Sequence, residues 1–367
     1  MLPYKNEKEP LIISVGGGKG GVGKSMVVSN LSTQYALSGM KVVLIDLDFG
    51  AANLHTLFGI RQPPKGLGDY FTTPRSQLKD FLVKTELENL LLISGSGFVP
   101  ELANLKHMQK TKLIKQIKKL PTDLVLLDLG AGSANNVVDF FSMTCAGIVV
   151  TTPEPTAIVN AYEFLKNVIY RILFRMFRNH RDISEILRES TLPNNRLNIT
   201  SIGELIETLA KKNEWIANNI QEVCSDLDFY IVFNQAKKAD EAQIGAKLRE
   251  ICLRYLSLDL NFSGMIFYNE EVPAAVFKMR PISLIKPNSI TVQTLKRTAT
   301  QIMNHIISRS LNGQKLETFE KQLSRVMKFA QDDYQQNLLI QKRLQRERLK
   351  NYTPQGEHVS LKPLAPE

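Results

Sequence analysis

One glycine-rich stretch near the N-terminus constrains the fold of this chain more than any other feature. It reads Gly18-Lys19-Gly20-Gly21-Val22-Gly23-Lys24-Ser25 and fits the pattern G-x-x-x-x-G-K-[ST]. An apolar run over residues 11–15 precedes it, and apolar residues at helical spacing follow it from Val28. Strand, glycine loop and helix in this order predict a phosphate-binding loop, because glycines let backbone N–H groups turn toward a polyphosphate and the helix N-terminus adds free donors. We expect Lys24 to reach the β- and γ-phosphates and Ser25 to bind Mg²⁺.

Two further apolar runs end in aspartate. Residues 41–46 have the composition of a strand buried on both faces of a parallel sheet, and they lead into Asp46 and Asp48. Residues 123–128 repeat this pattern, end in Asp128 and continue into a glycine-containing loop. Ligands bind beyond the C-terminal ends of such strands. One carboxylate of the first pair is therefore expected to order water around Mg²⁺ and the other to position an attacking water, while Asp128 fits the Walker B position.

Apolar runs and amphipathic segments continue to alternate along the chain. Further strands are predicted over residues 90–94, 146–152, 229–234 and 262–267. The amide of Asn234, at the end of one of these strands, could pair with both a donor and an acceptor of an adenine ring. The predicted fold is therefore an α/β protein, with a mostly parallel sheet covered by helices on both faces.

Three helical regions are predicted outside this alternation. Residues 158–177 are apolar almost all round, which favours a helix buried against the sheet or at a subunit contact over a membrane span, since Lys166, Arg171 and Arg175 interrupt it and Arg178 follows. Residues 179–226 are predicted to be a helical insertion with one helix over 202–220. Residues 311–350 are predicted to form a long amphipathic helix with a basic end, which packs on the domain, pairs with a partner helix or binds a membrane surface.

These segments define the expected domain organisation. An N-terminal extension covers residues 1–10, one P-loop domain covers 11–310, and a disordered tail covers 351–367. The absence of a cleavable N-terminal signal pattern favours the cytoplasm, with peripheral contact at the inner face of the membrane as a further option.

Composition narrows the classes of function. An apolar fraction of 43% and a charged fraction of 22% over 367 residues are sufficient for a substantial core. The net charge of +10 is compatible with nucleic acid, with an anionic membrane or with neither. The cysteines Cys145, Cys224 and Cys252 lie far apart, which argues against a disulfide framework or a cysteine-bound metal.

Lys19 adds a second lysine to the loop. Two lysines that bracket Gly-Gly-Val-Gly resemble the deviant Walker motif of the MinD/ParA family of ATPases. The segments 46–53 and 128–132 match the same family in order and spacing. The run over residues 150–156 is most similar to the FlhG (FleN) branch, whose members set flagellar number and position. The resemblance covers about residues 10–170 and 228–308.

The resemblance implies roles for individual residues. It implies a slow, Mg²⁺-dependent ATPase with ATP and ADP as ligands, in which Lys19 reaches the nucleotide of the opposite subunit. Lys19, Lys24 and Asp48 would be catalytic, and Asp48 would position the hydrolytic water. Ser25, Asp46 and Asp128 would serve the metal, the two aspartates through its bound water. The residues implied to bind the nucleotide are Gly18, Lys19, Gly20, Gly21, Val22, Gly23, Lys24, Ser25, Met26 and Asn234.

The family also implies a kind of function. ATP would close a homodimer, hydrolysis would open it, and the two states would differ in affinity for a partner protein or a surface. A ParA-like ATPase that partitions cargo on nonspecific DNA is the alternative. The chain also departs from its relatives, since Phe267 and Asn269 stand where many of them have Pro and Asp, and residues 1–10 contain no Asp-Gln-Ala motif.

Overall fold

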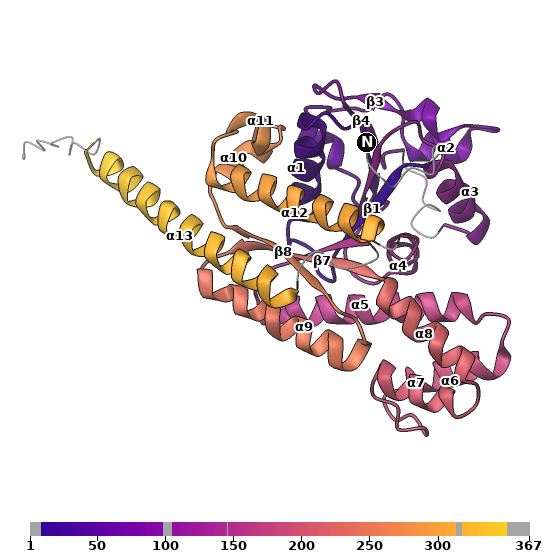
Figure 1. The fold of residues 1–367 in the computed structure, drawn as a ribbon. Coiled ribbons are helices and arrows are strands. Elements are labelled where there is room, and N and C mark those ends of the chain that lie inside the picture. Colours follow the sequence, from indigo (N-terminus) through magenta and orange to yellow (C-terminus); the bar gives the residue numbers. More distant parts are fainter. Residues whose placement is uncertain (1–8, 98–104, 145, 313–317, 351–367) are drawn as a thin grey trace, which may run out of the picture.

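The computed structural model describes residues 9–97, 105–144, 146–312 and 318–350 (Figure 1). Its centre is an eight-stranded sheet of order β3-β4-β2-β5-β1-β6-β7-β8. Only β3 runs antiparallel to its neighbour β4, so the predicted mostly parallel sheet is confirmed. The strands are β1 (Leu11–Gly16), β2 (Val42–Leu47), β3 (Val83–Lys84), β4 (Leu90–Ile93), β5 (Leu124–Leu129), β6 (Ala146–Thr151), β7 (Asp228–Ala236) and β8 (Asn261–Phe267).

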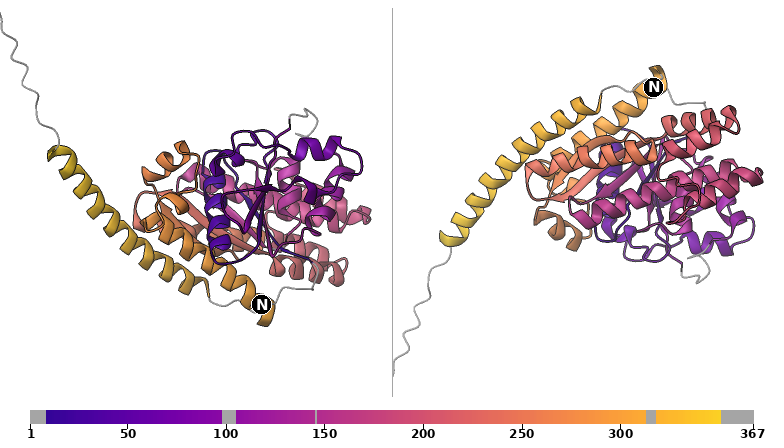
Figure 2. Two further views of the ribbon diagram at one scale, coloured as in Figure 1. Left: turned by 90° about the horizontal axis from the view of Figure 1, so that it is seen from above. Right: turned by 90° about the horizontal axis from the view of Figure 1, so that it is seen from below.

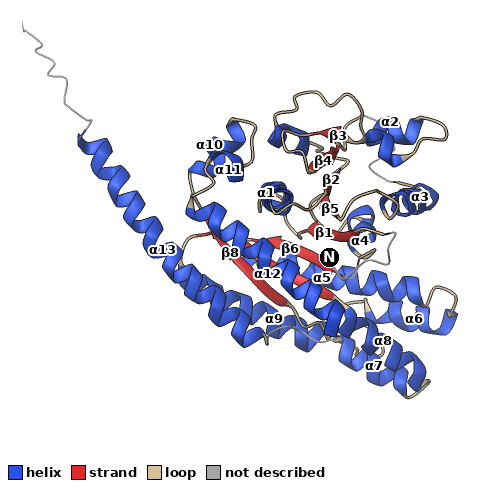
Figure 3. Cartoon of the chain, turned by 45° about the horizontal axis from the view of Figure 1, so that its top comes forward, coloured by secondary structure: helices blue, strands red, loops and turns tan. Residues whose placement is uncertain are grey.

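Helices cover both faces of this sheet (Figures 1 and 3). One face carries α1 (Lys24–Leu37), η1 (Leu54–Phe58), α10 (Glu271–Phe277), α11 (Ile282–Ile285) and α12 (Ile290–Asn312). The other carries α2 (Leu67–Thr72), η2 (Leu78–Phe81), α3 (His107–Ile117), α4 (Asn135–Phe141), α5 (Pro155–Met176), η4 (Ala239–Glu241), α9 (Ala242–Leu256) and α13 (Phe319–Lys350).

The apolar runs form strands because each strand contributes to two cores. Val43 and Ile45 of β2 pack in the core under α3 and α5, whereas Val42 and Leu44 pack in the core under α1 and α12. Successive side chains of a strand point to opposite faces, so a strand covered on both sides must be apolar at every position. The predicted strands therefore lie where their composition placed them.

The chain crosses the sheet in opposite directions from its two central strands. From β1 it passes through α1 toward β2, and from β5 it passes through α4 toward β6 on the other side. A crevice opens beyond the carboxyl ends of the strands where the direction of winding reverses. The loops after β1, β2 and β5 meet at that crevice.

The insertion contains more helices than the sequence predicted. The single helix expected over residues 202–220 is wrong, because α7 (Ile202–Ala210) and α8 (Glu214–Asp226) are separate and follow α6 (Arg181–Ser190). The break has a local cause. Asn213 caps α8, with its side-chain oxygen accepting from the N–H of Trp215 at 3.0 Å.

Helix α5 lies against the sheet, as predicted, with Phe164 and Val168 fully buried. No helix within the described parts of the chain combines the length and apolar character needed to cross a membrane.

Helix α13 is divided into a packed half and a projecting half. Its first half covers the edge strand β8, where Oε1 of Gln322 accepts from the backbone N–H of Phe262 at 3.0 Å. Its second half extends away from the body of the protein, with Leu339 67% exposed (Figure 2). Residues 311 and 312, predicted to begin this helix, belong to α12 instead. The predicted disordered tail and most of the N-terminal extension lie outside the described residues.

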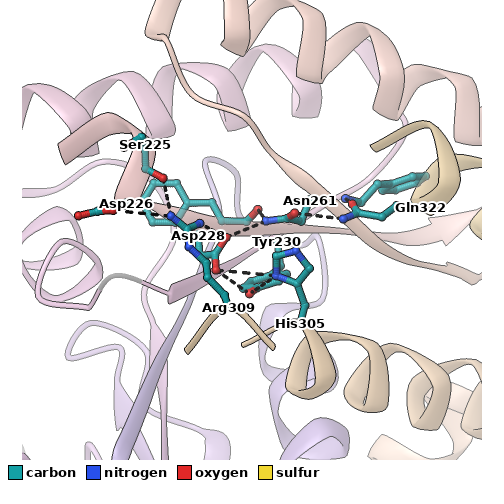
Figure 4. Close-up of polar contacts among 10 residues, drawn as sticks. Ser225, Asp226, Asp228, Tyr230, Asn261, His305, Arg309 and Gln322 are labelled. Carbon is teal, nitrogen blue, oxygen red and sulfur yellow. Dashed lines mark hydrogen bonds and ion pairs between the residues drawn. The ribbon is translucent and has the colours of Figure 1, made fainter. Parts of the chain in front are cut away.

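A network of hydrogen-bonded side chains connects the two C-terminal helices, α12 and α13, to the sheet (Figure 4). Arg309 of α12 donates to Asp228 of β7 at 2.6 Å, and Asn261 of β8 donates to the same carboxylate oxygen at 3.2 Å. Gln322 of α13 then donates to the side-chain oxygen of Asn261 at 3.2 Å. Because these side chains are hydrogen-bonded to one another, the network specifies how α12 and α13 dock.

Candidate nucleotide-binding site

The phosphate loop connects β1 to α1 and is shaped by its glycines. Gly21 and Gly23 have φ angles of 79° and 86°, which glycine adopts without strain. A Cβ atom on Gly18 would lie 1.9 Å from the carbonyl oxygen of Asn160, so the loop backbone lies directly against α5. The predicted strand, loop and helix are therefore present, and Gly23 is the N-cap residue of α1.

Lys24 lies at the base of this loop. It is buried, and burial lowers the pKa of its ammonium group, while the nearby carboxylates of Asp128 and Asp48 act in the opposite direction. A desolvated cation is poorly compensated without further negative charge. The site is therefore suited to an anionic ligand.

Asp46 and Asp128 face each other across neighbouring strands. They are register partners on β2 and β5, and each is only 1% exposed. The carboxylate of Asp46 accepts from the N–H groups of Asp48 and Leu54, both at 3.1 Å, which fixes the loop after β2. Burial, with the charge of Asp128, raises the pKa of Asp46 well above its usual value.

Asp128 provides the clearest indication of a cation. Burial raises its pKa to about 7, although a hydrogen bond from Ser25 and the charge of Lys24 act against that rise. Its Oδ1 atom is buried and has no hydrogen-bond partner. A buried, unsatisfied carboxylate oxygen beside Ser25 fits a water molecule carried by Mg²⁺.

The acidic residues do not form a metal cage by themselves. Over the described ranges, no group of three or more His, Cys, Asp or Glu side chains converges closely enough to hold a metal ion. Mg²⁺ usually keeps several waters and takes phosphate oxygens as ligands, so this arrangement suits a metal that enters with a nucleotide.

Asp48 lies at the rim of the crevice, between the loops that follow β2 and β5. Its Oδ1 atom accepts from the N–H of Ala51 at 3.2 Å, and a Cβ atom on Gly130 would lie 3.2 Å from the same oxygen. The N–H of Gly132 donates to the carbonyl of Gly17 at 3.1 Å. The loop after β5 therefore contacts both Asp48 and the phosphate loop.

Lys19 does not approach these carboxylates. Its ammonium group contacts Oε2 of Glu154 at 3.4 Å and the hydroxyl of Thr156 at 3.2 Å, both at the start of α5, and its side chain is 40% exposed. The two loop lysines thus have different environments. Glu154 and Thr156 belong to the segment 150–156 that carries the family resemblance, but nothing in that pattern indicates their contact with Lys19.

Asn234 lies behind the loop, buried at the end of β7. Its amide donates to the carbonyl of Val22 at 2.8 Å. One amide hydrogen and the side-chain oxygen remain for an adenine contact, which stays a prediction. The adjacent Gln235, which the sequence did not indicate, donates to the carbonyl of Gly21 at 3.1 Å.

The fold and this site together define a P-loop nucleotide-binding protein. Residues 13–282 match the family model described as the CobQ/CobB/MinD/ParA nucleotide binding domain, and the chain belongs to this family.

Curated relatives point to positioning proteins within that family. The antiactivator FleN of Pseudomonas aeruginosa is 26% identical over 324 residues, covering 85% of this chain and 92% of FleN. The flagellum site-determining protein YlxH of Helicobacter pylori is 29% identical and covers 44% of this chain and 55% of YlxH. The septum site-determining protein MinD of a Synechocystis species is 35% identical, covering 41% of this chain and 56% of MinD.

Solved structures show the same fold. The MinD of Pyrococcus horikoshii complexed with Mg-ADP superposes with a TM-score of 0.54 at 18% identity, covering 81% of this chain and 98% of that structure. A ParA family ATPase of Chlorobium tepidum gives 0.54 at 15% identity, with 79% and 98% covered. The predicted resemblance to the MinD/ParA family, including its FlhG (FleN) branch, is thereby confirmed.

Proposed function

We propose that this chain is an ATP-dependent dimerisation switch that controls the position or number of a cellular structure such as the flagellum. The observation that carries the proposal is the contrast between the two loop lysines. Lys24 is buried beside Asp128, whereas the side chain of Lys19 is 40% exposed and contacts the start of α5. A rim lysine is accessible to the nucleotide of a second copy, as the family resemblance implies.

The chemistry would be electrostatic and slow. The N–H groups of the loop and Lys24 would bind the phosphates, Ser25 would hold Mg²⁺ directly, and Asp46 and Asp128 would hold water bound to it. A metal ion held there would supply positive charge beside the phosphate oxygens. Asp48, at the rim, positions the attacking water, and no covalent intermediate is needed. Slow hydrolysis suits a switch, because the lifetime of the dimer is its signal.

The relatives support the flagellar branch of this proposal. FleN, whose name describes an antiactivator, is covered over 92% of its length, and YlxH is named for flagellar site determination. A partner protein is therefore expected. The projecting half of α13, which ends in a basic sequence over residues 342–350, is a candidate for peripheral membrane contact of a cytoplasmic protein.

Light scattering of an Asp48→Ala variant tests the proposal. With saturating Mg-ATP this variant should form a dimer and release no phosphate, because it binds ATP and lacks the group that positions water. Asp182→Ala, an exposed change on α6, is the control and should hydrolyse ATP as the wild type does. An Asp48→Ala protein that stays monomeric with ATP would contradict the switch.

The DNA-partitioning alternative makes a different prediction. The ParA structure fits this fold as well as MinD does, and the net charge of +10 is compatible with nucleic acid. ATP-dependent retention on nonspecific DNA that falls steeply with salt would favour this alternative. Pelleting with anionic liposomes, using the full chain and a chain lacking residues 342–367, would favour the membrane instead if only the full chain binds.

A further inference from the structure

Two consecutive residues of β7 hold two consecutive carbonyls of the phosphate loop. Asn234 donates to the carbonyl of Val22 at 2.8 Å, and Gln235 donates to that of Gly21 at 3.1 Å. Neighbouring side chains of a regular strand point to opposite faces and could not both reach one loop. The geometry of β7 must therefore be irregular at this point.

Gln235 creates that irregularity. Its φ angle is 58°, a left-handed value that is uncommon for residues other than glycine, asparagine and aspartate. The pairing of β7 with β8 shifts register between Phe233 and Ala236, which spans the same position. Left-handed backbone at a non-glycine residue is unfavourable and persists where surrounding structure over-determines it, typically at functional sites.

The two hydrogen bonds orient the peptide groups of the loop. In a trans peptide the C=O and the N–H of the same unit point in opposite directions, and no described peptide bond of the chain is cis. Turning the carbonyls of Gly21 and Val22 toward β7 therefore turns the N–H groups of Val22 and Gly23 away from it. These N–H groups belong to the part of the loop where a phosphate would be bound.

We propose that Gln235 is a positioning residue that locks the phosphate loop in its anion-receiving conformation. Asn234 holds the loop in the same way, but it is buried. It lies so close to the loop that a Cβ atom on Gly23 would be 2.2 Å from its amide nitrogen. Gln235 is exposed, so its side chain can be changed without creating a cavity. The proposal rests on nucleotide binding at this loop, and it names a residue that fixes the loop before nucleotide arrives.

Three variants separate the hydrogen bond from the backbone strain. Gln235→Met keeps a side chain of similar length and loses the donor. Gln235→Gly loses the donor and relieves the strain at φ 58°. Gln235→Lys restores a donor. Ser257→Gly is the matched control, because Ser257 at the end of α9 has a φ of 51° and plays no part in the site.

The first readout is hydrogen exchange of the nucleotide-free protein over residues 17–25. Gln235→Met and Gln235→Gly should exchange faster there than the wild type, while Gln235→Lys and Ser257→Gly should not. The melting temperature of Gln235→Gly should be unchanged or slightly higher, since glycine tolerates the left-handed backbone. Equal exchange in all variants would overturn the proposal.

The second readout is the dissociation constant of a fluorescent ADP analogue with Mg²⁺. Losing one hydrogen bond that preorganises the loop should weaken binding about three- to tenfold in Gln235→Met and Gln235→Gly, and less than about twofold in Gln235→Lys. Unchanged affinity in the first two variants would overturn the proposal while nucleotide binding stands. Failure of the wild type to bind nucleotide would instead refute the proposed function, and the exchange experiment would still decide the role of Gln235.

Discussion

The ammonium group of Lys19 lies 3.4 Å from Oε2 of Glu154 in the same chain. The hydroxyl of Thr156 accepts from the same group at 3.2 Å, so two residues at the start of α5 hold the lysine. A lysine that acts on a second subunit would have to leave these partners. The contact within one chain would therefore compete with dimer formation.

Glu154→Gln should consequently strengthen ATP-dependent dimerisation. The ion pair between Lys19 and Glu154 is solvent-exposed, so breaking it costs little free energy. The apparent dimer dissociation constant should therefore fall only about two- to fivefold. Sedimentation across a protein dilution series with Mg-ATP measures this change. Glu163→Gln, an exposed change of the same charge on α5, should have no effect. Weaker dimerisation of Glu154→Gln would show that Glu154 serves the dimer instead.

The ion pairs of Asp139 should make the free energy of unfolding depend on pH. Burial alone raises its pKa, but Arg171 and Lys110 outweigh this and hold the pKa below its ordinary value. The ion pairs therefore stabilise the folded state above the pKa of the unfolded chain, and this stabilisation disappears as pH falls through the lower pKa of the folded state. Asp139→Asn should lower the free energy of unfolding by about 3 kcal/mol at pH 7.

Urea titrations at pH 7, 5 and 3 check the sign of this effect. The difference in unfolding free energy between Asp139→Asn and the wild type should be similar at pH 7 and 5. It should become smaller below the ordinary aspartate pKa of about 4. Asp80→Asn, an exposed change on η2, should show no such trend. A difference that grows on acidification would contradict the ion-pair explanation.

Two glycines of the phosphate loop should respond differently to alanine. A Cβ atom on Gly18 would lie 1.9 Å from backbone of α5, whereas one on Gly20 would have its nearest neighbour at 3.9 Å. Gly18→Ala must displace the loop and should cost about 3 kcal/mol in unfolding free energy. Gly20→Ala should stay within about 1 kcal/mol. Thermal melting of the nucleotide-free proteins compares them directly, and equal stabilities would refute the close contact with α5.

Variants of two adjacent aspartates test which contacts hold α13 against α12. Asp333 is buried and accepts from the hydroxyl of Thr294 at 2.6 Å and from Arg297, both on α12. Asp333→Asn should destabilise the protein by about 2 to 3 kcal/mol and increase hydrogen exchange along β8, because the first half of α13 covers that strand. Asp332→Asn, on the exposed side of the same helix, should change neither. Equal behaviour of the two variants would contradict anchoring through Asp333.

The sequence alone determined the features that depend on short-range pattern. Glycines at fixed spacing predicted the loop before Lys24, and apolar runs that end in aspartate predicted where Asp46 and Asp128 stand, because parallel strands bring their carboxyl ends to one edge. It failed where a single side chain outweighed the pattern. Helix α7 ends at Ala210 and Asn213 caps the start of α8, so one predicted helix became two.

Only the tertiary structure decided which residues meet at the loop. Lys19 contacts Glu154 across 135 positions of sequence, and Gln235 contacts Gly21 across 214. Neither pairing leaves a periodic signal, because each depends on how strands and helices stack and on one left-handed residue in β7. The local spacing of residues thus specified a phosphate-binding loop. Long-range packing decided that Gln235 contacts this loop and that Lys19 contacts Glu154.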